Sequence, residues 1–147
     1  MSLRGTFKTN KDAEINGVEV AVGVNDHNGE PIYINISRMG VANKKYTKRL
    51  EEVMAPHQAA LQNDSMNNEL AGKLLREVFV DTVLNGWRNL PKSELTGKDS
   101  DTAELEFNRD NALALFEELP EMYTDWADRA KKAASFRDAV RDKVAKN

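Results

Sequence analysis

The sequence predicts an α+β fold, a mainly helical domain with a small N-terminal antiparallel β-hairpin and a long C-terminal helix. Two segments alternate apolar with small or polar residues: "VEVAVGV" at residues 18–24 and "PIYINI" at residues 31–36. The turn between them contains an Asn-Gly pair, which is typical of a β-hairpin. Downstream, apolar residues recur with the spacing of helices. The 147 residues have the size of one domain, so we assign residues 1–147 to a single domain.

Two helices are expected after the hairpin. Asn43 is suited to cap the first of them, and Pro56 breaks or kinks it. The second is predicted from residue 66 to residue 87, and its apolar surface is broad enough for the central, most buried helix. This excess of apolar surface also predicts that the chain self-associates.

The C-terminal part of the chain predicts two more helices. Residues 88–107 form a polar loop with short extended flanks, which favours a second small hairpin. Asn108 caps the next helix, and Pro120 begins the last one, because proline suits the first helical turn but cannot continue a helix. The apolar stripe of the last helix extends to Val144 but is thin, so we expect residues 138–147 to be a frayed, basic helical end.

Charge is unevenly distributed, although the net charge is only −3. Residues 92–128 hold three basic and eleven acidic side chains, whereas residues 129–147 hold seven basic and two acidic ones. A basic stretch without an intervening acid lies upstream of both segments. Such stretches are usually solvated faces, and the alternative is a surface for an anionic partner. This candidate basic patch consists of Arg38, Lys44, Lys45, Lys48 and Arg49.

Motifs of catalysis are missing from the sequence. There is no cysteine, the eight glycines form no nucleotide-binding loop, and neither His27 nor His57 lies in a nucleophile motif. We therefore expect a protein that is not an enzyme and that needs no cofactor or metal. No apolar run is long enough to span a membrane. The start lacks the apolar core of a signal peptide, so we expect a soluble, cytosolic protein. Residues 1–14 are expected to be flexible.

Aromatic residues near the C-terminus have two interpretations. At helical spacing they are core residues by default, because burial of one ring stabilises a fold by about 1.5–3 kcal/mol. Trp and Tyr are also frequent anchors of protein contacts. The candidate partner-binding residues are Leu119, Met122, Tyr123, Trp126 and Phe136.

Four short motifs in a fixed order resemble a known family. They are "SRMGVANKKY" at residues 37–46, "GWRNL" at 86–90, "NRDNALALFEELPEMYTDW" at 108–126 and "SFR" at 135–137. Over most of residues 15–137, their order and spacing are similar to those of bacteriophage tail assembly chaperones from long-tailed, non-contractile phages.

The resemblance implies a protein made in the cytoplasm of the infected host cell and absent from the finished virion. Such a protein binds the tape-measure protein, helps to recruit tail-tube subunits around it, and forms oligomers. The family defines no catalytic residue. Its members are commonly made in two lengths by a programmed frameshift, and Ala145–Asn147 can be encoded with the slippery heptamer A AAA AAC, which makes a longer form a hypothesis for this chain.

Two other functions fit parts of the sequence. A nucleic-acid-binding module would use the basic patch and the basic C-terminal end, but the acidic residues 92–128 argue against it, and we expect no nucleic-acid partner. Its affinity would fall steeply with salt, unlike that of an apolar groove. The second alternative is a permanent structural protein of the head-tail junction, which would stay in the particle.

Overall fold

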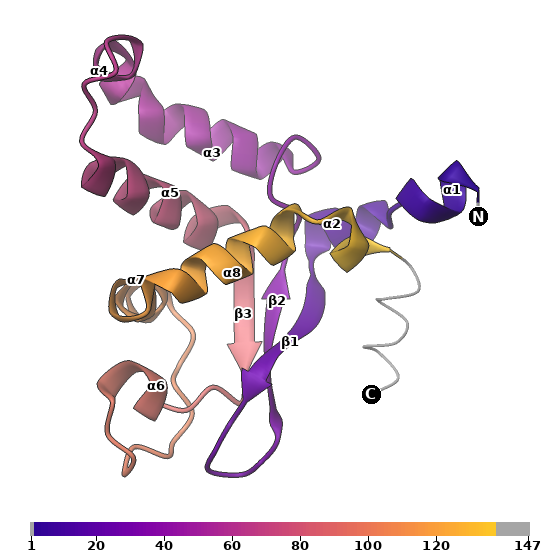
Figure 1. The fold of residues 1–147 in the computed structure, drawn as a ribbon, viewed down its shortest axis with the longest axis vertical. Helices are drawn as coiled ribbons and strands as arrows, with labels where there is room; N and C mark the ends of the chain where they lie inside the picture. Colours follow the sequence, from indigo (N-terminus) through magenta and orange to yellow (C-terminus); the bar gives the residue numbers. More distant parts are fainter. Residues whose placement is uncertain (1, 138–147) are drawn as a thin grey trace.

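The sheet has three antiparallel strands, one more than the sequence predicted. The computed structural model describes residues 2–137, and in this part of the chain the strand order is β1-β2-β3 (Figure 1). The hairpin prediction is confirmed by register, since Val20 pairs with Ile34. On the other side Ile34 pairs with Trp87. The strands are β1 (Val18–Val24), β2 (Pro31–Ile36) and β3 (Leu84–Arg88).

The two faces of the sheet differ in burial because side chains alternate along each strand. Ile34 and Ile36 are fully buried on the inner face. Tyr33 directly precedes Ile34 in the chain, points to the other face, and is only partly buried. On its face the Arg88 guanidinium packs over the Tyr33 ring at 3.9 Å from the centroid, and Arg88 forms an ion pair with Glu19. The outer face is therefore polar, and the inner face belongs to the core.

The central helix α5 (Asn68–Thr82) is shorter than predicted. The prediction that it continues to residue 87 is wrong because Asn85 and Gly86 are poor helix formers and β2 offers unpaired backbone groups to a third strand. Only the last turns of α5 are buried, around Phe79, whereas Leu70 in its first turn is exposed. The helix is thus central at its C-terminal end alone.

Helix α3 (Lys44–Met54) begins and ends where the sequence predicts. Asn43 is the N-cap, and its side chain accepts a hydrogen bond from the backbone N–H of Tyr46. The Nδ2 atom of Asn43 also donates to the carbonyl oxygen of Thr82. Beyond Met54 the chain continues as a 3₁₀ turn that contains Pro56. Helix α3 packs along α5 as an antiparallel pair (Figure 1). The connection consists of η1 (Ala55–His57) and α4 (Gln58–Gln62).

The predicted second hairpin exists as a pair of short flanks around a helical turn. The N–H of Leu105 donates to the carbonyl of Leu90, and Pro91 pairs with Glu104 in an antiparallel bridge. Between the flanks lies α6 (Ser93–Thr96), which the sequence did not predict.

The last two helices are α7 (Arg109–Glu118), capped by Asn108, and α8 (Pro120–Lys131). Pro120 starts α8 as predicted. The prediction of one long C-terminal helix is wrong, because α8 ends at Lys131 and the chain turns back through η2 (Ala133–Phe136). This turn brings Phe136 into the core, fully buried. The predicted frayed tail at 138–147 lies outside the described residues.

The N-terminal segment forms two short helices, α1 (Leu3–Phe7) and α2 (Lys11–Asn16). Helix α2 packs on the domain through buried Ala13 and Glu14. Helix α1 contributes no buried side chain and projects away from the body of the protein, on the side opposite to the α3–α5 pair (Figure 1). The fold class is confirmed as a mainly helical domain with a small antiparallel sheet. Among the described residues, the helices are too short or too polar to cross a membrane.

Candidate partner-binding surface

Helix α8 carries most of the predicted contact residues, and the structure divides them into two groups. Trp126 is 2% exposed and Phe136 is 0% exposed, so both belong to the core. Phe136 therefore packs inside the domain, and Trp126 reaches the surface only where it lines a groove described below. Their assignment to a contact surface stays a prediction. Leu119, Met122 and Tyr123 are only partly buried and pack against the edge of the core.

An aromatic cluster anchors α8 to its neighbours. The rings of Phe79 on α5, Phe116 on α7 and Tyr123 on α8 contact one another edge to face, with centroids 5.4–5.7 Å apart. Trp126 adds a further edge-to-face contact with Phe116 at 5.4 Å. Such pairs contribute about 0.5–1.5 kcal/mol each beyond burial, so the orientation of α8 is well fixed.

The first depression lies beside Tyr123 and has a volume of about 300 Å³. Its lining is mainly apolar and aromatic, with the exposed residues Thr124, Asp128 and Lys131 also contributing. We call it the Tyr123 depression. Its other lining residues are Met39, Tyr46, Leu75, Tyr123 and Ala127.

Burial raises the pKa of the Tyr123 phenol from 10.0 to about 12, with a smaller contribution from Tyr46. The folded protein therefore keeps the Tyr123 proton at pH values where the unfolded chain loses it. The contribution of the neutral Tyr123 phenol to the free energy of unfolding is complete below pH 10.0 and is lost between pH 10.0 and about 12. In a spectrophotometric titration we expect the phenolate step near pH 12 to disappear in Tyr123→Phe and to persist in Tyr33→Phe. Burial also raises the pKa of Tyr46, so its delayed step stays in both variants. A late step unchanged in Tyr123→Phe would contradict this assignment.

A second depression lies on the other side of α8, between this helix and the end of β1, with a volume of about 250 Å³. We call it the β1–α8 groove. The exposed acids Glu94 and Asp125 line it together with a larger apolar set. The apolar side chains are those of Val22, Val24, Ile32, Leu90, Met122 and Trp126.

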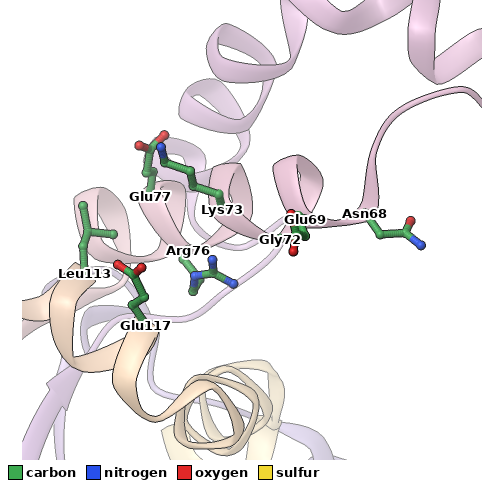
Figure 2. A pocket seen from close by; sticks show the side chains of 8 residues that line it. All are labelled: Asn68, Glu69, Gly72, Lys73, Arg76, Glu77, Leu113 and Glu117. Carbon is green, nitrogen blue, oxygen red and sulfur yellow. The ribbon is translucent and has the colours of Figure 1, made fainter.

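A third cavity, of about 440 Å³, lies between the N-terminal part of α5 and the second half of α7 (Figure 2). Its charged lining residues have both signs, so neither anions nor cations are favoured over the whole cavity. No group of acids and histidines suited to hold a metal ion exists among residues 2–137. Its lining consists of Asn68, Glu69, Gly72, Lys73, Arg76, Glu77, Leu113 and Glu117.

The basic patch is not continuous in the folded protein. Arg38 forms an ion pair with Glu14 at 3.0 Å and packs over the Phe136 ring at 5.6 Å from its centroid. Arg49 forms an ion pair with Asp81 at 3.3 Å. The sequence did not reveal these pairs because the acidic partners lie on α2 and α5. The exposed remainder consists of Lys44, Lys45 and Lys48.

Sequence reasoning also missed a contact between His27 and Ser93. The Nε2 atom of His27 lies 2.8 Å from the Ser93 hydroxyl oxygen, and this pair joins the β1–β2 turn to α6. Within residues 2–137 the His27 ring forms no hydrogen bond to a carboxylate, so this pair lacks the third member of a catalytic triad there. The two residues lie 66 positions apart, so no local pattern in the sequence could have predicted this contact.

Comparison with known proteins places the chain in a family. No curated protein and no solved structure matches it. The sequence model of the YdaY prophage protein family matches residues 41–147. This match covers well over half of the chain, including α3, α5, α7 and α8. The chain therefore belongs to the YdaY prophage protein family.

Proposed function

We propose that this protein is a phage tail assembly chaperone that binds the tape-measure protein and helps to recruit tail-tube subunits, and that it leaves before the virion is complete. Two findings support the proposal: the prophage family, and the order of sequence motifs that resembles tail assembly chaperones. The work of such a chaperone is shielding, because a long helical chain with apolar stripes aggregates until the tube encloses it. Shielding needs a reversible apolar surface and no reactive group.

The Tyr123 depression is the surface that we propose binds the tape-measure protein. It is open and lined by aromatic and aliphatic side chains, and the aromatic cluster holds Tyr123 in place. A preformed apolar depression of this kind suits an apolar side chain of a tape-measure helix, while Asp128 and Lys131 supply polar contacts of either sign beside it. Leu119 is partly buried one turn before Tyr123, whereas Met122 lines the β1–α8 groove on the other side of α8.

Co-expression with the tape-measure protein of the same prophage tests this function. We expect the tape-measure protein to stay soluble and to co-purify, and Thr124→Arg to reduce the retained amount about tenfold or more, because a charged side chain then enters the apolar depression. Thr124 is exposed, so the variant should fold normally. The matched control is Thr102→Arg, an exposed threonine in the α6–α7 connection, which should retain the partner like the wild type.

Two results would count against the proposal. If the wild-type protein neither binds nor solubilises the tape-measure protein, the chaperone function is wrong. If Thr124→Arg retains it as well as Thr102→Arg does, the function stands but the Tyr123 depression is not the binding surface. Detection of the protein in purified virions would instead favour a permanent head-tail junction protein.

A further inference from the structure

We propose that the β1–α8 groove binds the N-terminal helix α1 of a second copy of the chain. This contact lies on the side of α8 opposite to Tyr123, involves no tape-measure protein, and is independent of the function proposed above. The argument rests on the exposure of α1, on the lining of the groove and on their charges.

Helix α1 presents an apolar face to solvent. Leu3 is 78% exposed and Phe7 is 66% exposed, and their i, i+4 spacing places them on one side of the helix. A helix of five residues has no stability of its own in water, and Gly5 in its middle weakens it further. A segment of this kind gains order when its apolar face is covered by another surface.

The β1–α8 groove has the complementary character. At the end of β1, Val24 is 54% exposed, and it lines the groove together with Val22 from the same strand and Met122 from α8. A volume of about 250 Å³ is several times the ~30 Å³ of one water molecule, so the groove admits large side chains. Its apolar lining residues are complementary to Leu3 and Phe7.

Charge favours the same pairing. Helix α1 and its C-cap carry Arg4 and Lys8, and neither forms an ion pair with any residue from 2 to 137. The groove contributes Glu94 and Asp125. Within the described residues, Asp125 pairs only with Arg129 on its own helix, at 3.0 Å. A basic, apolar helix thus faces an acidic, apolar groove.

The geometry points to a second copy as the donor of α1. Helix α1 projects from one side of the protein, whereas the end of β1 that lines the groove lies at the β1–β2 turn, at the opposite end of the strand from α2 (Figure 1). Because the helix and the groove are different surfaces, each copy can donate one and receive another. Such a contact is heterologous, and it closes into a ring or extends as a chain.

The test uses the purified full-length protein alone and measures its mass by light scattering and sedimentation over a range of concentrations. We expect the wild type to form concentration-dependent assemblies, and Phe7→Glu and Val24→Glu each to weaken association about tenfold or more. The matched control is Val41→Glu, at a position that is 90% exposed and lies outside the groove; it should associate like the wild type. Circular dichroism and urea unfolding verify that all variants fold.

Mixing the two defective variants gives the decisive measurement. Phe7→Glu keeps an intact groove and Val24→Glu keeps an intact helix α1, so the mixture should form a complex of one copy of each and grow no further. A wild type that is monomeric at every concentration, including one whose α1 occupies its own groove, would overturn the proposal. So would variants that associate like the wild type, or a mixture that forms no complex.

Discussion

Replacement of Trp126 by alanine is expected to lower the free energy of unfolding by about 3–5 kcal/mol. The side chain is 2% exposed, and its ring contacts Phe116 edge to face at 5.4 Å. Truncation removes one of the two ring contacts between α8 and Phe116 of α7 and leaves a cavity that the rigid aromatic cluster fills poorly. Urea unfolding followed by circular dichroism measures the change, since the loss of one tryptophan also alters fluorescence.

Two variants make the Trp126 measurement specific. Trp126→Phe keeps a ring at this position and should lose less stability than Trp126→Ala, whereas Val41→Ala, at an exposed site, should change stability by less than about 0.5 kcal/mol. A Trp126→Ala protein as stable as the wild type would show that this residue is not part of the core. If it also retained the tape-measure protein, Trp126 would have no part in binding either.

Replacement of Gly17 by alanine is expected to cost about 2–4 kcal/mol, the combined cost of backbone strain and a lost hydrogen bond. Gly17 has a φ of 103°, which side chains rarely tolerate, and it joins α2 to β1. A Cβ atom at this position would lie 2.0 Å from Asn35 Oδ1 and 2.6 Å from Asn85 Nδ2. These two atoms form a hydrogen bond of 2.9 Å between β2 and β3, which must break to make room.

The control for Gly17 is the same substitution at Gly23. Nothing lies within 4 Å of a Cβ atom built there, and its φ lies outside the range that strains side chains. We expect Gly23→Ala to change the free energy of unfolding by less than about 1 kcal/mol. Equal effects of the two substitutions in urea unfolding would mean that close approach at Gly17 does not limit stability.

Local signals in the sequence were sufficient for the elements that depend on local chemistry. Asn43 and Asn108 cap helices through hydrogen bonds to residues three positions ahead, and Pro120 begins a helix through its own fixed backbone angle. The β1–β2 turn is likewise a short-range feature. These predictions required no knowledge of the rest of the fold.

Elements that depend on distant partners could not be predicted in the same way. Residues 84–88 continue a helical apolar pattern and become a strand only because β2 lies beside them. The stripe of α8 shows that one side is apolar, but the burial of Trp126 depends on Phe116 from another helix. For the candidate site, the sequence predicted a helix with one apolar side that begins at Pro120, which the structure confirms, but it could not separate the buried from the accessible residues of that side.

The position of β2 in the middle of the sheet has a consequence for how the chain is synthesised. Its pairing with β1 is available as soon as residues 18–36 have left the ribosome, whereas its other edge pairs only with β3, which ends at Arg88. Until then the growing chain carries a two-stranded ribbon with an open edge and one apolar face, a form that is marginally stable in water and prone to pair with other chains. Translation adds about 5–20 residues per second, so the fifty or so residues between β2 and β3 take several seconds to synthesise. During this time a neighbouring chain can pair with the open edge of β2 before β3 is available.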